Sequence, residues 1–183
     1  MSRTNRRYKC FTMNKYLIHE INTPWSIIAT VLDVSKNPIV IGAGFKPINK
    51  LLKQLKLNSD AKLIKDSKLE GITEIVKDWI DGDLDAFRKI KLKQPGAEFM
   101  QSCWNQLRKI EGGKVLSYAQ LAQKAGNAKA VRAAGSACAK NLIAPFVPCH
   151  RIIKTNGDIG NYGFGVSLKK TLLEHEGVNL KRD

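Results

Sequence analysis

The sequence has no long hydrophobic run and few cysteines, and these absences exclude two broad classes of protein. No stretch approaches the roughly 20 consecutive apolar residues of a membrane-spanning helix, and the basic start MSRTNRRYKC is not followed by the apolar segment of a secretory signal. The four cysteines are too widely spread for a disulfide scaffold, and none forms a CxxC zinc pair. With 43% hydrophobic residues in a chain of 183, there is enough apolar material for a core. We therefore expect a soluble intracellular protein.

Acidic residues are also scarce relative to basic ones. Sixteen Asp and Glu stand against 31 Lys and Arg, which gives a formal charge of +15 at neutral pH. A basic surface binds nucleic acid because neutralising phosphates releases counterions. Scattered lysines also raise solubility or follow from codon bias, so charge alone leaves nucleic-acid binding and plain solubility as equal alternatives.

The first part of the chain is predicted to be a small α/β domain. Runs of β-branched and aromatic residues at 16–20, 25–32 and 38–45, separated by turn residues, predict a small antiparallel sheet. Apolar residues spaced by three and four over 48–55 and 72–80 predict two helices. A polar segment, KIKLKQPG, then suggests a boundary between a domain of residues 1–92 and a second domain of residues 93–183.

The second domain is predicted to be all-helical. An apolar face from Phe99 to Ile110 predicts one helix, and Ser167 is expected to cap a last helix that Gly177 closes. Cys103 lies on the apolar face of the first of these helices and is expected in the core.

Between these helices the sequence predicts a helix-turn-helix. Ser117 and Gln120 have the spacing of a capping box at the start of a short helix that Gly126 ends. Asn127 is expected to cap the next helix, over residues 128–140. Two short helices joined around a glycine are typical of this motif.

The second helix of the pair, AKAVRAAGSACAK, has almost no side-chain bulk on any face. Gly135 costs about 1 kcal/mol relative to alanine inside a helix, so a compensating contact is expected. A smooth helix allows the close approach of either a neighbouring helix or the minor groove of DNA. Arg132 is the one side chain able to reach into a base stack, while Cys138 is expected to contact the groove or to pack inside the protein.

Pro148-Cys149-His150-Arg151 is the sharpest local candidate for chemistry. Cysteine is a nucleophile as the thiolate, and a free pKa of about 8.5 leaves little thiolate at neutral pH. His150 is a candidate base acting through a bridging water, and Glu176 is a candidate to orient its imidazole. The alternative for an isolated Cys–His pair is an inert buried thiol beside an ordinary histidine.

Four motifs that follow one another along the chain favour a reactive Cys149 over an inert buried thiol. SYAQLAQKAGN, PCHR, GNY and LLEHEG, within about residues 99–177, resemble the O6-alkylguanine-DNA alkyltransferases. The resemblance implies irreversible transfer of an alkyl group from O6 of guanine in duplex DNA to Cys149, with O4-alkylthymine as a further candidate substrate. It implies a ribonuclease H-like first domain, a winged-helix-like helix-turn-helix in the second, and no cofactor.

The resemblance also implies roles at the reacting centre. His150 would be a water-mediated base on Cys149, and Glu176 would complete the hydrogen-bonded chain. Asn141 would bond the backbone near the reactive turn. Tyr118 would crowd the target phosphate and donate a proton toward guanine N3.

Further residues are implied to bind DNA and the base. A flipped nucleotide is required because O6 of a stacked guanine is out of reach of a thiolate, and Arg132 would fill the gap that the base leaves. The loop 160–165 would form one wall of the base pocket, with glycine at position 163 where some relatives have serine. The implied DNA contacts are Arg132, Tyr118, Ala130, Gly135, Ser136 and Arg151, and the implied pocket residues are Ile152, Tyr162 and Gly163.

Some relatives hold a structural zinc with cysteine and histidine in the first domain, but before residue 100 this chain offers only Cys10 and His19 as ligands of those two types. A tetrahedral site needs four, so we expect no metal. The upstream cysteines of relatives with a transcriptional role are also absent, which favours repair alone. The expected partner is double-stranded DNA containing O6-alkylguanine, bound by a monomer without an obligate protein partner or a membrane.

Two other functions compete with alkyl transfer. Alkyltransferase-like proteins flag lesions for other pathways but lack the nucleophile, so Cys149 argues against that function. A helix-turn-helix regulator would read the major groove with long polar side chains, and the alanines and glycine of residues 133–139 argue against it.

Overall fold

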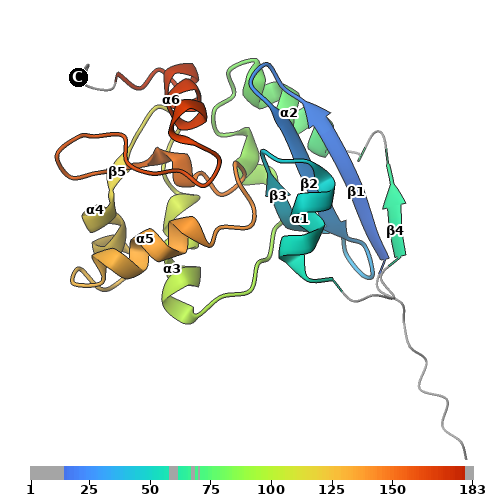
Figure 1. The fold of residues 1–183 in the computed structure, drawn as a ribbon, viewed down its shortest axis with the longest axis horizontal. Coiled ribbons are helices and arrows are strands. Elements are labelled where there is room, and N and C mark those ends of the chain that lie inside the picture. The colour runs from blue at the N-terminus through green and yellow to red at the C-terminus, as the bar shows by residue number, and fades with distance from the viewer. Residues whose placement is uncertain (1–14, 58–61, 67–68, 70, 180–183) are drawn as a thin grey trace, which may run out of the picture.

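A four-stranded sheet with helices on both faces lies beside a group of helices (Figure 1). The computed structural model describes residues 15–57, 62–66, 69 and 71–179. The strand order is β3-β2-β1-β4, with bounds β1 (Lys15–Asn22), β2 (Ile27–Asp33), β3 (Ile39–Gly44) and β4 (Lys62–Lys65). An α/β domain is thus joined to a mainly helical domain.

The sheet is mixed, which corrects the prediction of an antiparallel one. The three predicted strands pair antiparallel, but β4 pairs parallel with β1. This strand has four residues, KLIK, all exposed, so it lacks the alternation of apolar and polar residues that marks a half-buried strand.

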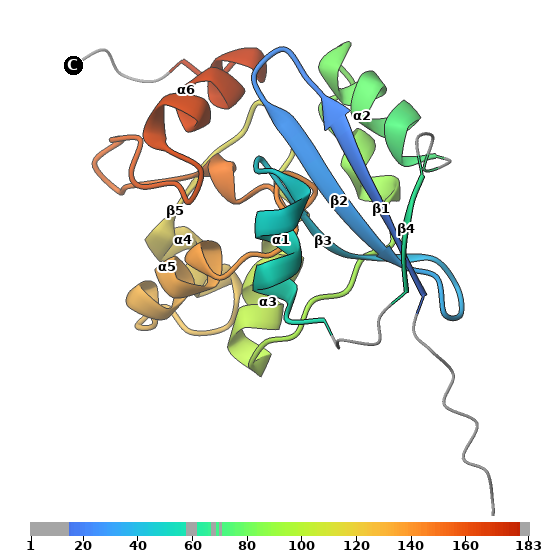
Figure 2. The same cartoon turned by 45° about the vertical axis from the view of Figure 1, so that its right-hand side comes forward.

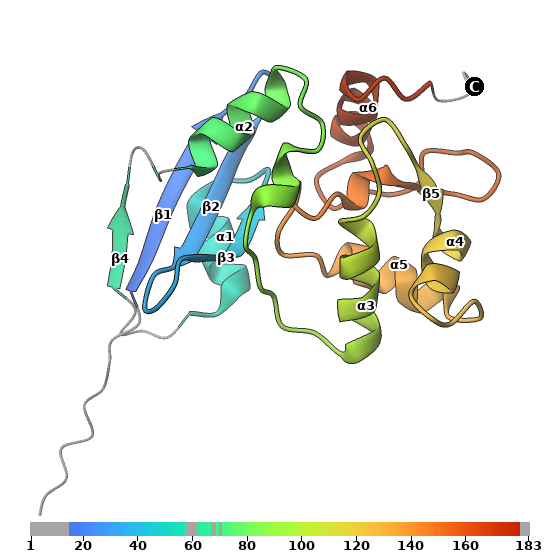
Figure 3. The same ribbon diagram turned by 180° about the vertical axis from the view of Figure 1, so that it is seen from behind.

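Helices α1 (Ile48–Leu55) and α2 (Ile72–Ile80) cover opposite faces of this sheet (Figures 2 and 3). Successive strand residues point to opposite faces, so β2 can serve both helices. Ala29 packs in a cluster with Leu51 of α1, whereas Ile28 belongs to the core that contains Trp79 of α2.

Strand β3 is an end strand of the sheet, and two later segments hydrogen-bond to it. After a short 3-10 helix, Ala86–Lys89, the chain runs beside Val40, whose N–H donates to Lys91 (3.0 Å) and whose carbonyl accepts from Lys93 (2.9 Å). Further along, Ala43 N–H donates to the carbonyl of Leu142 (2.8 Å). The sheet is therefore bonded directly to the segment that leads to Cys149.

The C-terminal part contains four helices and a small sheet, so it is not all-helical as expected. The helices are α3 (Glu98–Leu107), α4 (Tyr118–Lys124), α5 (Val131–Ala139) and α6 (Val166–His175). The parallel strands β5 (Leu116–Ser117) and β6 (Ile152–Ile153) have two residues each, too few to leave a periodic pattern.

Two helix starts also differ from the prediction. Ser117 caps α4, accepting from Gln120 N–H at 3.1 Å as expected, but α5 begins after Ala130. Asn127 accepts from Lys129 N–H (3.1 Å) and stabilises the preceding turn instead. Helix α6 begins after Gly165, whose φ of 101° suits glycine, so Ser167 lies inside the helix.

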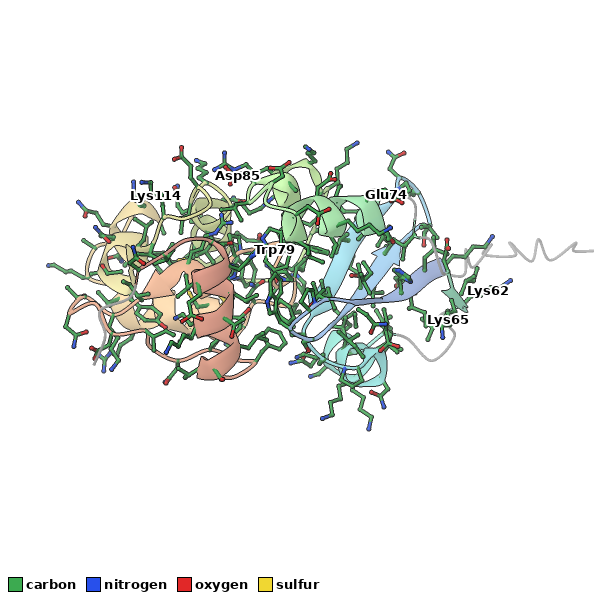
Figure 4. The ribbon with its side chains drawn as sticks, turned by 90° about the horizontal axis from the view of Figure 1, so that it is seen from above. Lys62, Lys65, Glu74, Trp79, Asp85 and Lys114 are labelled. Atoms are coloured by element: carbon green, nitrogen blue, oxygen red, sulfur yellow. The ribbon has the colours of Figure 1, made fainter. Side chains whose placement is uncertain are left out.

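One hydrophobic core runs through both parts of the molecule. Phe87 packs on Phe146 with ring centroids 4.9 Å apart, and Trp79 packs on His175 at 5.5 Å. Figure 4 places Trp79 near the middle of the molecule, with Lys62 and Lys65 at one end and Lys114 toward the other. Among the helices of the described residues, none has the length and apolar character needed to cross a membrane.

Candidate active site

Cys149 opens a one-turn 3-10 helix, Cys149–Arg151, between α5 and α6. It is 7% exposed, and its Sγ accepts a hydrogen bond from Asn141 Nδ2 at 3.2 Å. Burial raises the pKa of the Cys149 thiol, while the Asn141 bond and the positive charge of Lys169 act in the opposite direction. A base is therefore needed to form the thiolate.

Asn141 is fixed by its own hydrogen bonds. Its Nδ2 also donates to the carbonyl of Val147 (2.8 Å), and its Oδ1 accepts from Ile143 N–H (3.0 Å) and from Gln94 Nε2 (3.2 Å). The amide thus spans the turn before Cys149 and presents one N–H to the sulfur.

His150 and Glu176 form a fully buried pair. The Nε2 atom of His150 lies 3.1 Å from Oε1 of Glu176. Burial lowers the pKa of His150, so the ring is neutral at neutral pH. Because Nε2 faces a carboxylate, it carries the proton, and Nδ1 keeps its lone pair. Nδ1 is buried without a hydrogen-bond partner in the described residues, so this nitrogen is able to accept a proton.

Arg151 binds the carboxylate of Glu176 from inside the protein. Its Nε and Nη2 donate to the two carboxylate oxygens of Glu176 at 2.9 and 2.8 Å, a bidentate arrangement. Burial raises the pKa of Glu176, but His150 and Arg151 outweigh it and bring the pKa to about 2. Glu176 is therefore ionised at any physiological pH.

A hollow of about 640 Å³ opens above Cys149. Tyr118 of α4, Arg132 and Gly135 of α5, and the loop residues Tyr162 and Gly163 are among those that line it. A hollow of this size is in the range of small-molecule sites and can hold a base. The structure therefore brings most of the predicted pocket residues to one place beside the thiol.

Comparison with known proteins finds matches over the part of the chain that contains these residues. A family profile described as "6-O-methylguanine DNA methyltransferase, DNA binding domain" matches residues 98–178. A probable methylated-DNA–protein-cysteine methyltransferase of Acanthamoeba polyphaga mimivirus is 38% identical over 122 residues, which cover 67% of this chain and 78% of that protein. The chain belongs to this methyltransferase family.

A second methyltransferase of the family, from Methanosarcina acetivorans, is 42% identical over 99 residues. The match covers 54% of this chain and 63% of the archaeal protein, so the chain spans less than two thirds of that relative's length. Among solved structures, a variant of the Mycobacterium tuberculosis O6-methylguanine methyltransferase has a TM-score of 0.71 at 26% identity, covering 92% of this chain and 96% of that one. The fold is thus shared well beyond the segment that the profile matches.

Two buried side chains of this family member were not identified from the sequence. Gln94 bridges the inter-domain segment to the reactive turn, accepting from Leu142 N–H (2.8 Å) through Oε1. Lys169 of α6 donates to the carbonyls of Ile152, Ile159 and Asn161. Burial lowers its pKa to about 8, and the neighbouring Cys149 and Cys138 oppose this shift. The sequence signal for Lys169 is a charged residue on the otherwise apolar face of its helix.

Arg151 and Ile152 lie elsewhere than predicted. Arg151, expected at the DNA, is 3% exposed, and its Nη1 donates to Ile110 (2.6 Å). Its guanidinium is occupied inside the protein and does not reach a phosphate. The side chain of Ile152 in β6 is fully buried, and it lies in the core rather than among the residues that line the hollow.

The remaining DNA candidates lie on or next to α5. Arg132 and Ser136 are exposed, whereas Ala130 and Gly135 are half-buried. A Cβ at Gly135 would lie 3.9 Å from the Tyr118 ring, so this glycine borders α4.

Two other cysteines have locations that were predicted from the sequence. Cys103 is fully buried in the core, and Cys138 lines the hollow. Cys10 lies outside the described residues. His19 is bonded to Thr73 (3.3 Å), and no group of three or more metal-ligating side chains occurs in the part of the chain that the structure describes.

Proposed function

We propose that the protein repairs DNA by direct reversal, moving the alkyl group of O6-alkylguanine in duplex DNA to Cys149. The sulfur–carbon bond forms as the carbon–O6 bond breaks. The base takes the thiol proton, Tyr118 gives one proton to the released guanine, and the proton held by the base then restores the Tyr118 hydroxyl. The observation that carries this proposal is the placement of the Cys149 sulfur in the hollow next to the buried His150–Glu176 pair. No cofactor is needed, and the protein is consumed because the thioether is stable.

His150 acts as the base through Nδ1. Glu176 holds the proton on Nε2 and stabilises the imidazolium that forms when Nδ1 takes the thiol proton, directly or through one water. Lys169 and Asn141 stabilise the thiolate, since both lower the pKa of Cys149.

DNA binds through α5, and the damaged nucleotide turns out of the stack into the hollow. Arg132 occupies the gap in the duplex, and Tyr118 crowds the phosphate and donates its hydroxyl proton toward guanine N3. Burial and then the nearby Cys138 and Cys149 raise the pKa of Tyr118, so the hydroxyl is protonated and available as a donor. O4-alkylthymine fits the same scheme as a second substrate. M. tuberculosis OGT, which is similar to this chain at a TM-score of 0.65 and 25% identity, was solved in complex with DNA. That complex supports the proposal that this chain binds DNA.

The test is the intact mass of the protein before and after incubation with duplex DNA that contains O6-methylguanine. We expect a gain of one methylene per molecule on Cys149, saturating at one equivalent. Cys149→Ser should bind the lesion without gaining mass, while the matched variants Cys103→Ser and Cys138→Ser should still be methylated. Tight binding by the wild type without a mass change would instead make this a lesion-recognition protein.

We also infer the finer organisation. The domains are taken as residues 1–92, ribonuclease H-like, and 93–183, with a winged helix-turn-helix. The protein acts as a monomer inside the cell, in the cytoplasm of a prokaryote or the nucleus of a eukaryote. Analytical ultracentrifugation with and without DNA tests the monomer.

A further inference from the structure

Phe164 connects the pocket loop to the end of strand β3. It follows Tyr162 and Gly163, which line the hollow, and its ring packs on Tyr162 with centroids 5.3 Å apart. The same ring also meets Phe45, just beyond β3, edge to face at 5.7 Å. A residue of the first domain is therefore separated from the pocket wall by one aromatic ring.

The contact is close and involves three consecutive residues, Gly44, Phe45 and Lys46. A Cβ at Gly44 would lie 3.0 Å from Cζ of Phe164, so a larger residue would force the ring to move. The Nζ of Lys46 lies 4.7 Å from the centroid of the same ring and donates to Gln54 of α1 at 2.6 Å. We call residues 44–46 the β3 clamp.

The loop needs such support because its own backbone is permissive. Gly160 and Gly165 have φ of 70° and 101°, and a Cβ at Gly163 would meet nothing within 4 Å. Lys169 holds the start of the loop through the carbonyls of Ile159 and Asn161. The aromatic pair of Phe45 and Phe164 supports the middle, where Tyr162 and Gly163 face the hollow.

We propose that the β3 clamp determines which size of alkyl group on guanine the protein accepts. By holding Phe164, these positioning residues fix how far Tyr162 and Gly163 stand from Cys149. A tightly held wall favours a methyl group, and a released wall admits a larger group at the expense of the smaller one. This inference rests on the proposed alkyl transfer.

The experiment compares two substrates in one duplex sequence, one with O6-methylguanine and the other with O6-benzylguanine, in competition for the same protein. Because the DNA is otherwise identical, binding through α5 cancels in the ratio of transfer rates. Phe45→Leu keeps an apolar side chain but removes the aromatic pair, and we expect the benzyl-to-methyl ratio to rise about two- to tenfold. The control is Val31→Ala, which destabilises the same sheet in the separate cluster around Leu51 and should leave the ratio at the wild-type value.

An unchanged or reduced ratio in folded Phe45→Leu, or an equal rise in Val31→Ala, would overturn the inference. Thermal unfolding shows whether each variant is folded. If Phe45→Leu does not fold, Gly44→Ala is the test variant. Its added methyl displaces the Phe164 ring, so the ratio should change from the wild-type value, and an unchanged ratio would overturn the clamp. Failure of the wild type to react with either substrate would refute the proposed function itself, a result distinct from an altered ratio.

Discussion

Glu176 balances the positive charge of Arg151 and fixes the tautomer of His150 in the buried site beside Cys149. Glu176→Gln removes the negative charge that fixes the His150 tautomer and leaves Arg151 with the longer pairing to Asp85, at 3.8 Å. We expect single-turnover methyl transfer to slow about 100-fold, since a general base contributes about 10²–10⁴. Stability should fall by about 3–5 kcal/mol, the cost of breaking a buried ion pair. The exposed neighbour Glu174, which pairs with Lys170 at 4.0 Å, gives the matched control Glu174→Gln, with little effect on either quantity.

The same residue links stability to acid. Its folded pKa of about 2 lies below the ordinary glutamate value of about 4.3, so the folded state binds this proton less readily than the unfolded state. The stabilisation is complete above about pH 4.3 and is lost as the pH falls toward 2. Urea unfolding across this range should show a steeper loss for the wild type than for Glu176→Gln, and parallel curves would contradict the assignment.

Lys169 and Lys170 are adjacent residues with different surroundings. Lys169 is fully buried and bonded to three carbonyls, whereas Lys170 is exposed. We expect Lys169→Met to cost about 2 kcal/mol in urea unfolding, because buried carbonyls lose their donor. It should also slow transfer, since the charge of Lys169 lowers the pKa of Cys149. Lys170→Met should stay within about 0.5 kcal/mol of the wild type.

At the scale of elements, α5 is expected to act on DNA and not on the thiol. Arg132→Ala should weaken binding to a duplex with O6-methylguanine and slow transfer from it about tenfold, in the range of 1–2 kcal/mol for one lost contact. Reaction with the free base O6-benzylguanine should be unchanged because Cys149, His150 and Glu176 are intact. Arg88→Ala, which removes another exposed arginine, from the 3-10 helix Ala86–Lys89, is the control. An equal loss toward the free base would contradict the proposed role of Arg132.

The elements that can be predicted from the sequence are those with a strong local signal. The strands β1, β2 and β3 have long β-branched runs, and α4 has a capping box, so the amino-acid pattern alone locates them. The short strands β4, β5 and β6 leave no such pattern, since their pairing depends on partners distant in sequence. The prediction for Arg151 was wrong for a related reason: a charged residue beside a reactive cysteine looks exposed until its buried partner, Glu176, is seen. Nothing local in the sequence brings Gln94 to Asn141.

At the scale of the whole molecule, the charge of +15 is expected to attract the protein to the negative phosphates of DNA. If about six phosphates are neutralised, affinity for a damaged duplex should fall about 10³-fold between about 50 and 200 mM salt. Fluorescence anisotropy measures this slope. The reaction with free O6-benzylguanine is the control, because it involves no phosphate and should respond little to salt. A flat response of duplex binding would show that phosphates contribute little.

The bond from Ala43 N–H to the carbonyl of Leu142 joins the sheet to the residue that follows Asn141. Ala43 is buried in the core that both parts share, and Leu142 packs against that core, so we do not expect local fraying to release this bond. The Ala43 amide proton exchanges with solvent only when the two parts separate. This single amide is therefore a spectroscopic reporter of the junction. Its protection against exchange in deuterated water measures the free energy of separating the sheet from the reactive turn, independently of any substrate.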